Sequence, residues 1–457
     1  MKMLSSEKMR IERDLLGDVH IETDAAYGSQ TQRTLNIYPT QHVKVLGDYP
    51  VFLQSLLQLK KACALTNLQN NELSQPNAHA IVAVIDQLLN ENSVELKKYF
   101  AIHAYHGGGG VGINMNLNEV IANLANQLYF ERPYGSYSPI HPNNHINLNH
   151  STSDFLKTSI QITVIKIWEK LKISIDHLEQ SMRHFILQYG AEKKLSRTCL
   201  QDAVEVSFGQ MFGGYLFAIS RHMIELQHNI DELHGINIGG NIIGRSGDCS
   251  TAFYENIMLE LSSITQNTNL FRVENLFDAS QNNDVLIRFS SNLSQFASTL
   301  IRIAKDLRLM SSGPETGFRE LTLAAVQQGS SAMPGKINPN IPEYVIQTAF
   351  HVIGLCHSIQ VTQMHDELDY SPWQTFIATQ LFDVLYLLTD AIDVFSEHCI
   401  AGLKPNSPQN LKNLESLIPT MVQLSKQVGY AEASNVYKKF HGDLDQIKAF
   451  IKTLQGN

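Results

Sequence analysis

The stretch "TSDFLKTSIQITVIKIWEKLKISIDHLEQSMRHFILQY", residues 152–189, contains neither glycine nor proline. Its apolar residues recur at intervals of three and four, the spacing that places side chains along one face of an amphipathic helix. This apolar stripe consists of Leu156, Ile160, Val164, Ile167, Leu171, Ile175, Leu178, Met182 and Phe185. An average globular helix has about 11 residues, so the sequence predicts one unusually long helix here.

Similar helical patterns follow along the chain, at residues 203–234, 281–310, 342–365 and 373–400. Shorter patterns precede the long stretch, near 50–70 and 76–100. Such rods rarely bury their whole apolar face within one chain. The sequence therefore predicts an all-α protein, an elongated bundle of long helices that belongs to an oligomer.

Changes in composition and helical pattern along the chain predict three domains. Residues 1–148 mix helical patterns with glycine-rich and polar loops, and residues 149–400 carry the long helices. The linker "GLKPNSPQN" (402–410) precedes a small C-terminal helical domain, which we expect to span 401–457.

Composition excludes several classes of protein. The 457 residues carry a net charge of −9, so no basic surface for nucleic acid is expected. Five scattered cysteines without a Cys-x-x-Cys pair suggest neither a disulfide framework nor a zinc site. The first residues lack the apolar core of a secretory signal, and no apolar run approaches about 18 residues. We therefore expect no membrane association and a cytoplasmic location.

One loop that interrupts the helical pattern is a candidate for binding or catalysis. The segment "QQGSSAMPGKINPNIPE" (327–343) is rich in small residues and proline, which break helices. It also carries Lys336 and Asn338, which are two residues apart and can point at one carboxylate from an extended backbone. Loops on a rigid scaffold often hold binding and catalytic groups, although an ordinary surface connection has the same composition.

Four further stretches join this loop in a resemblance that runs in order from about residue 10 to 400. "GSSAMPGKINP" (329–339) resembles the signature loop of the aspartase/fumarase superfamily, and "NMNLNEVIAN" (114–123) resembles its first motif. The other matching stretches are "RIERDLLGDVHIETDAAYGSQTQRT" (10–34), "HPNNHINLNHSTSD" (141–154) and "RTCLQDAVEVSFGQ" (197–210). In its detailed sequence, the chain resembles aspartases more than fumarases.

The resemblance implies a homotetramer with a twenty-helix core, in which each active site is built from three chains. It implies an anti elimination from a succinyl-type dicarboxylate, giving fumarate, without a metal or organic cofactor. The first serine of the loop, Ser330, is implied as the base. The residues implied to bind substrate are Asn116, Ser151, Thr152, Ser153, Thr198, Cys199, Ser331, Lys336 and Asn338.

These implied residues also have plainer interpretations. "STSD" (151–154) is a suitable cap for the long helix as well as an anion site at its N-terminus. Arg197 can serve the structure through buried hydrogen bonds. "HPNNH" (141–145) matches the family's outlying second anion site, and its two histidines are equally compatible with a structural role.

The sequence departs from the family pattern where the leaving group is held. Val111, Ser153 and Cys199 replace a threonine, an asparagine and a histidine or glutamine. Loss of the histidine argues against a fumarate hydratase. A buried ammonium without acceptors is costly, and Arg245, in "GGNIIGRSGDCS" (239–250), could grip an additional carboxylate. Arg245 is equally compatible with a solvent-facing or ion-paired side chain.

Three functional hypotheses follow from the resemblance and these departures. The first is reversible elimination of ammonia from L-aspartate, and the second is a carbon–nitrogen lyase that acts on an N-substituted aspartate in a specialised pathway. The third is an inactive homologue, which the intact Ser330, Lys336 and Asn338 argue against. The overall resemblance favours the first hypothesis.

Overall fold

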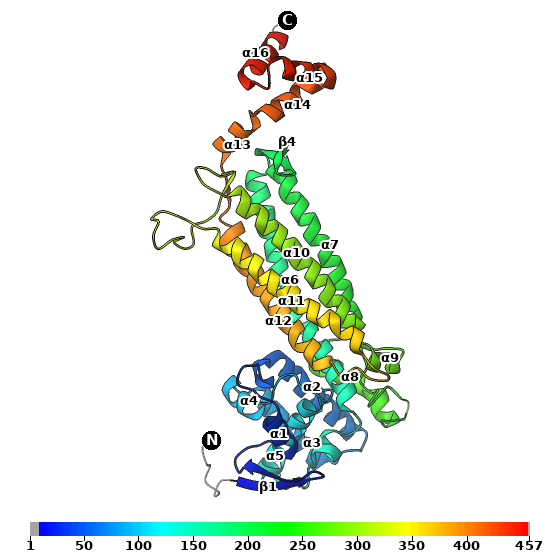
Figure 1. Cartoon of the computed structure of the whole chain (residues 1–457). Helices are drawn as coiled ribbons and strands as arrows, with labels where there is room; N and C mark the ends of the chain where they lie inside the picture. The colour runs from blue at the N-terminus through cyan, green and yellow to red at the C-terminus, as the bar shows by residue number, and fades with distance from the viewer. Residues whose placement is uncertain (1–8, 246, 456–457) are drawn as a thin grey trace. The chain divides into compact units, whose positions relative to one another are not determined.

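The computed structural model describes residues 9–245 and 247–455, and most of them are helical (Figure 1). The chain forms two compact units. Unit 1 comprises the chain up to residue 170, residues 225–293 and residues 354–386, and unit 2 comprises the rest. Each long helix contributes one segment to each unit. The domain boundaries at 148 and 400 stay a prediction. Each unit consists of segments that are distant in sequence, so this division does not test them.

The long helix predicted from residues 152–189 is confirmed. It is α6 (Thr152–Tyr189), with 38 residues, and Gly190 follows its last residue. Every member of the apolar stripe is at most 2% exposed. Helical spacing of apolar side chains therefore determines both the length of this helix and the face that it buries.

Four other long helices accompany α6, namely α7 (Phe208–Leu233), α10 (Asp284–Met310), α11 (Asn340–Thr362) and α12 (Gln374–Phe395). Within unit 2, α6 packs against α7, and the ring centroids of Phe185 and Phe212 lie 4.2 Å apart. The Tyr215 hydroxyl of α7 donates to Asp306 of α10 at 2.8 Å. These contacts make α6, α7 and α10 neighbours in a bundle of long helices, which Figure 1 shows, and confirm the predicted all-α class; the oligomer stays a prediction.

The predicted start of the second long helix, residue 203, is wrong. Residues up to 207 form β4 (Gln201–Ser207), which pairs antiparallel with β3 (Lys193–Thr198). The alternation of valines with polar residues in "QDAVEVS" has a period of two and favours a strand. The helix starts only where this alternation ends.

The predicted helix at 76–100 is divided in two. It consists of α3 (Gln75–Leu89) and α4 (Ser93–Tyr99). Asn92 caps α4, because its side-chain oxygen accepts from the backbone N–H groups of Val94 and Glu95. An asparagine that caps a new helix therefore ends the old pattern.

Unit 1 contains further helices and several short strands. They are β1 (Met9–Asp14), β2 (Gly17–Glu22), α1 (Ser29–Ile37), η2 (Leu46–Asp48), α2 (Pro50–Gln69), α5 (Val111–Phe130), η3 (Pro142–Ile146), β5 (Gly235–Ile236), α8 (Thr251–Thr265), β6 (Phe271–Arg272), α9 (Leu276–Gln281) and η4 (Gln363–His365). The buried carboxylate of Glu119 joins α5 to α1, since it accepts from the backbone N–H groups of Gly28, Gln30 and Thr31.

Unit 2 ends in a group of short helices with a core of their own. Leu424, Ala433, Val436 and Ile447 are buried together there. The remaining elements of unit 2 are β7 (Leu321–Thr322), η5 (Ser396–Ile400), β8 (Lys404–Pro405), α13 (Ser407–Leu414), α14 (Leu417–Val428), α15 (Tyr430–Lys439) and α16 (Leu444–Gln455).

Among the described residues, one helical stretch, Gln374–Ile400, is long and apolar enough to cross a membrane. Within its most apolar window, 61% of the residues are buried inside the protein. Burial of this kind is typical of a core helix in a bundle.

Candidate active site

The signature loop of unit 2 is closed by its own backbone. The Gly329 N–H donates to the carbonyl oxygen of Lys336 at 2.8 Å, and the Asn338 side-chain amide donates to the Gly329 carbonyl at 2.8 Å. A Cβ atom at position 329 would lie 2.6 Å from the Lys336 oxygen. Only glycine fits this close approach, so the pair Gly329–Asn338 fixes the base of the loop.

Ser330 follows this closure and lies in a defined hydrogen-bonding environment. Its Oγ accepts from the backbone N–H groups of Ala332 at 3.1 Å and Met333 at 3.0 Å. The hydroxyl proton takes no part in either bond. Hydrogen bonds donated to an oxygen favour its anionic form, so the turn that holds Ser330 also suits a serine oxyanion.

The other loop residues differ in how accessible they are. Lys336 and Ser331 are exposed, so a ligand can reach their side chains. Asn338 is half-buried, and one of its amide protons is committed to the Gly329 carbonyl. A carboxamide offers two N–H donors, so closing the loop is compatible with the predicted role of Asn338 in binding substrate.

The second group of predicted residues lies in unit 1, at the start of α6. Asp154 caps this helix, and its Oδ1 accepts from the Ser151 N–H at 2.9 Å. Its Oδ2 accepts from Gly239 N–H at 3.1 Å and Asn241 N–H at 2.8 Å. Burial raises the pKa of Asp154 to about 7, while these backbone donors act in the opposite direction. Asp154 therefore ties the start of α6 to the 239–241 loop.

The three hydroxyls at this helix start are not equivalent. Ser151 and Thr152 are half-buried, and a helix N-terminus favours an anion near them. Ser153 is 4% exposed, and its hydroxyl has no hydrogen-bond partner among the described residues. The first two hydroxyls are open to a substrate carboxylate, whereas the third faces the interior.

The first motif lies on α5. Gly110, with φ of +83°, caps this helix, and Val111 is its first residue, 48% exposed. Asn116 is completely buried, and its side-chain amide donates to the Tyr99 carbonyl at 3.0 Å. The substrate-binding role of Asn116 stays a prediction, and its described contact is with the backbone.

In unit 2, the tip of the β3–β4 hairpin carries Thr198 and Cys199, both exposed. Cys199 and Leu200 have φ values of +53° and +60°, as the tight turn requires. Arg197, just before the tip, forms an ion pair with the fully buried Glu320. Lys194 pairs with the same carboxylate at 3.1 Å, and this cluster gives Arg197 the structural role that the sequence allowed.

Arg245 has the ion-paired geometry that the sequence left open. Its Nε and one terminal nitrogen lie 2.9 and 2.5 Å from Asp248 Oδ1. The Arg245 side chain is 71% exposed. To bind a substrate carboxylate, Arg245 would have to divide its N–H donors between the substrate and Asp248 or break this ion pair. Its substrate-binding role therefore stays a prediction.

The two histidines near η3 are engaged with the backbone. His141 Nδ1 accepts from the N–H groups of Asn143 and Asn144 at 3.1 and 3.4 Å. His145 Nδ1 accepts from the His141 N–H at 2.8 Å. Burial lowers the pKa of His145, so these contacts support a structural role for the pair.

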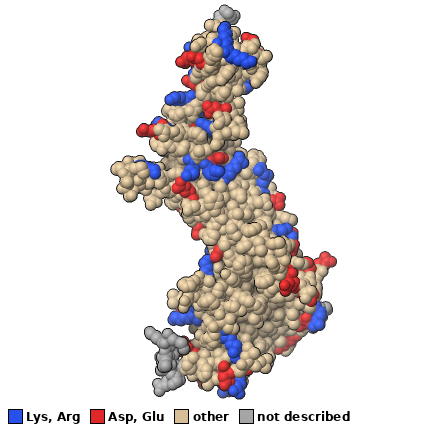
Figure 2. All heavy atoms as spheres, in the orientation of Figure 1, with Lys and Arg blue, Asp and Glu red and all other residues tan. Residues whose placement is uncertain are grey.

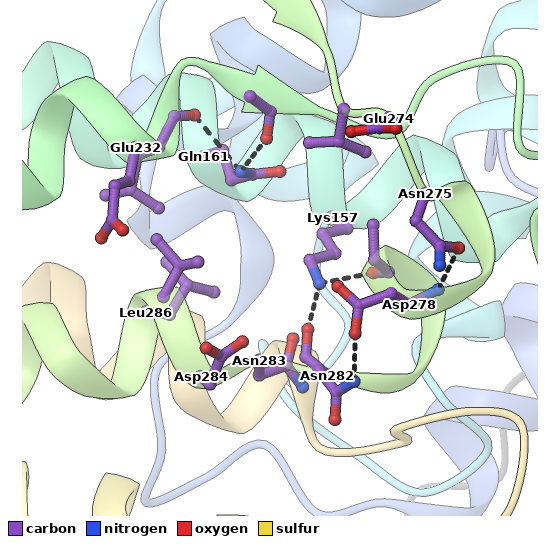
Figure 3. A pocket seen from close by; sticks show the side chains of 15 residues that line it. Lys157, Gln161, Glu232, Glu274, Asn275, Asp278, Asn282, Asn283, Asp284 and Leu286 are labelled. Carbon is purple, nitrogen blue, oxygen red and sulfur yellow. Dashed lines mark hydrogen bonds between the residues drawn. The ribbon is translucent and has the colours of Figure 1, made fainter.

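Unit 1 also contains a cavity of about 310 Å³, which none of the predicted site residues lines (Figure 3). Lys157 extends into it and donates to the backbone carbonyls of Ala279 and Asn282, at the end of α9. Gln161 donates to the carbonyls of Leu233 and Gly235. These two side chains join segments of unit 1, which accounts for their burial.

The predicted site residues are divided between the two units. Unit 1 holds Asn116, Ser151, Thr152, Ser153 and Arg245, and unit 2 holds Thr198, Cys199 and the loop residues Ser330, Ser331, Lys336 and Asn338. In unit 1, Thr152 and the α5 motif are joined directly, because the Asn114 side-chain amide donates to Thr152 Oγ1 at 3.0 Å.

Comparison with known proteins identifies the family of the chain. Residues 17–354 match a family model described as lyase. The chain is 34% identical to an aspartate ammonia-lyase of Pseudomonas aeruginosa, over 94% of this chain and 90% of that protein. It is 30% identical to the aspartate ammonia-lyase of Bacillus subtilis, over 96% of this chain and 90% of that protein.

Solved structures are similar over the same extent. A cobalt-bound crystal structure described as fumarate lyase:delta crystallin, from Brucella melitensis, matches with a TM-score of 0.91 and 32% identity, over 96% of this chain and 95% of that chain. A class II fumarase from Schistosoma mansoni matches with a TM-score of 0.89 and 25% identity, over 97% and 95%.

The family match and these relatives show that the chain is a carbon–nitrogen lyase built as a bundle of long helices. The chain belongs to the aspartase/fumarase superfamily.

One set of polar residues near the site was not predicted. Lys60, Asn147 and His150 are joined by hydrogen bonds to Asn114 or to one another. The sequence contains one indication of Lys60: it is a charged residue on the face of the 50–70 helix that is buried. Its partners are distant in sequence, so no spacing rule indicates them.

Proposed function

We propose that the chain catalyses the reversible anti elimination of ammonia from L-aspartate, which gives fumarate. The observation that carries this proposal is the environment of Ser330, whose Oγ accepts two backbone N–H groups inside a closed loop. The similarity to aspartate ammonia-lyases over nearly the whole chain supports the same reaction.

In this reaction Ser330, as its oxyanion, removes a proton from the carbon next to one substrate carboxylate. The electron pair of the broken C–H bond moves into that carboxylate and forms a doubly charged aci-carboxylate. Preorganised donors and cations stabilise such an intermediate, and Lys336 and Asn338 are the groups that we assign to it. The intermediate then collapses, the carbon–nitrogen bond breaks with its electron pair on nitrogen, and the amine leaves.

Thr152 and Ser151 are assigned to a substrate carboxylate, because they are the accessible hydroxyls at the N-terminus of α6. Thr198 and Cys199, on the exposed hairpin tip, are assigned to the substrate from another chain. A cytoplasmic location and a small dicarboxylate substrate belong to the same proposal, and no nucleic acid or membrane enters it.

One observation favours the second candidate, a lyase for an N-substituted aspartate. Val111 begins α5 with a half-exposed apolar side chain where the family usually has threonine. If Val111 faces the leaving amine, an apolar substituent on nitrogen fits there better than a bare ammonium, which needs acceptors.

We further propose a homotetramer with composite active sites. In unit 2, the long helices leave large apolar side chains exposed, among them Phe217, Ile224 and Phe350, at 73%, 68% and 60%. The face drawn in Figure 2 is mostly uncharged, with acidic and basic groups interspersed. Exposed apolar surface of this extent is typical of an interface, and other copies of the chain would cover it.

Composite sites are tested by mixing two defective variants, Ser330→Ala and Thr152→Val. If the two residues of one site come from different chains, random hybrid tetramers regain intact sites with about a quarter of the wild-type activity. The measurement is fumarate formation after the variants are denatured together and refolded, with each variant refolded alone as the control. A hybrid tetramer, verified by light scattering, that stays as inactive as its parents would contradict this arrangement.

A further inference from the structure

Lys60 lies in the interior of unit 1, on α2, and is 1% exposed. Its ammonium contacts Asn114 Oδ1 at 2.7 Å, His150 Nε2 at 2.8 Å and Asn147 Oδ1 at 3.2 Å. It also lies 4.2 Å from the centre of the Phe155 ring on α6. These polar contacts account for all three N–H bonds of the ammonium.

The ammonium determines the direction of every hydrogen bond around it. A charged lysine only donates, so His150 Nε2 must accept. The His150 proton then resides on Nδ1, where it meets the Leu148 carbonyl at 2.9 Å. Burial lowers the pKa of His150, in agreement with a neutral ring.

The same logic extends to the predicted substrate hydroxyl. Because Asn114 Oδ1 accepts from Lys60, its Nδ2 is the donor, and it donates to Asn147 Oδ1 at 2.9 Å and Thr152 Oγ1 at 3.0 Å. Thr152 Oγ1 is therefore an acceptor toward the interior. Its own O–H is therefore not used toward Asn114 and can donate to a ligand.

We propose that Lys60 is a positioning residue, which acts through Asn114 to hold Thr152 as a hydrogen-bond donor to a substrate carboxylate. The inference rests on the proposed assignment of Thr152 to that carboxylate. Chains of hydrogen bonds that start at a charge polarise one another, so the cation strengthens the Thr152 donor. The N-terminus of α6 favours an anion at the same place.

The charge on Lys60 is sensitive to pH. Burial lowers the pKa of Lys60 to about 7, while interactions with Cys63 on the same helix and Asp154 on α6 act in the opposite direction. The neutral His150 faces it from the loop before α6. As pH rises through this range the cation is lost, so we expect anion binding to weaken in the wild-type protein.

The test is binding of fumarate, by calorimetry, to the full-length protein and three variants: Lys60→Met, Thr152→Val and the double variant. Each single change is expected to weaken binding by about 10- to 150-fold, the range for a lost hydrogen bond to a charged group. Because both changes act through one hydroxyl, the double variant should bind fumarate at most about threefold more weakly than Thr152→Val alone. The weakening of binding with rising pH should also be smaller in Lys60→Met than in the wild type, and what remains belongs to Asp154, whose pKa burial raises to about 7.

Lys61→Met is the matched control. Lys61 neighbours Lys60 on α2, but its ammonium is paired with Asp86 at 2.6 Å and is partly exposed. The control removes the same charge outside the network and should bind fumarate like the wild type. If Lys60→Met binds within twofold of this control, or if the effects of Lys60→Met and Thr152→Val multiply, the inference is overturned.

A second variant keeps the test valid if Lys60→Met does not fold. Asn114→Asp has nearly the same volume and leaves the buried ammonium with an ionic partner. Its carboxylate cannot donate to Thr152, so fumarate binding should weaken by at least about tenfold. Unchanged binding would overturn the inference. An enzyme that binds fumarate but forms none from L-aspartate would instead overturn the proposed reaction alone.

Discussion

Replacing Ser330 by alanine is expected to lower kcat by at least about 10²-fold, the lower range for a positioned proton transfer. The variant loses the oxygen that accepts from the Ala332 and Met333 N–H groups. These two donors would stabilise a serine oxyanion, and alanine offers no basic atom in its place. The measurement is steady-state fumarate formation at saturating substrate.

The fold should survive this change, because Ser330 lies on a loop whose base is fixed by Gly329 and Asn338. Ser298→Ala, on the exposed side of α10, is a control with the same chemical change in the same unit. Circular dichroism and molecular mass should match the wild type for both variants. A Ser330→Ala enzyme with near-wild-type turnover would show that another group is the base.

Replacing Lys336 by methionine is expected to lower kcat/KM by about 10²- to 10³-fold, the loss seen when one preorganised donor to a developing anion is removed. Lys336 is exposed on the loop, and it is the cation that we assign to the aci-carboxylate. Methionine keeps most of the length of the side chain but not its charge. The measurement is kcat/KM, followed through the formation of fumarate.

Lys412→Met, on the exposed surface of α13, removes the same charge from the same unit and serves as the control. If both lysine variants lose activity equally, the general charge of the protein is responsible rather than a specific contact. If neither loses activity, the aci-carboxylate is stabilised by other groups.

The helices were the most predictable part of this protein. The stripe from Leu156 to Phe185 indicated α6 from end to end, because a long uninterrupted period of three and four has few other interpretations. The β3–β4 hairpin was missed, because its short strand runs directly into α7. The break at Asn92 was also missed, since a capping asparagine resembles an ordinary polar residue within a helix.

The site was predictable only to the extent that its residues are close together in sequence. The loop 329–339 could be identified as one segment. The closure of Gly329 onto Lys336 and Asn338 depends on how closely two parts of the backbone approach each other, which the residue types alone do not indicate. The partner of Arg245, Asp248, is three residues away and could have been found by spacing. Lys60 and Asn114 are 54 residues apart, and only the fold joins them.

The central claim is the elimination of ammonia from L-aspartate, and the most direct measurement is the absorbance of fumarate formed from a panel of substrates. The panel contains L-aspartate, L-malate and several N-substituted aspartates, each incubated with the wild-type protein and with Ser330→Ala as the blank. We predict that L-aspartate yields fumarate with the highest kcat/KM of the panel and that L-malate yields none above the blank. A protein that forms fumarate from an N-substituted aspartate or from L-malate, but not from L-aspartate, would contradict the account.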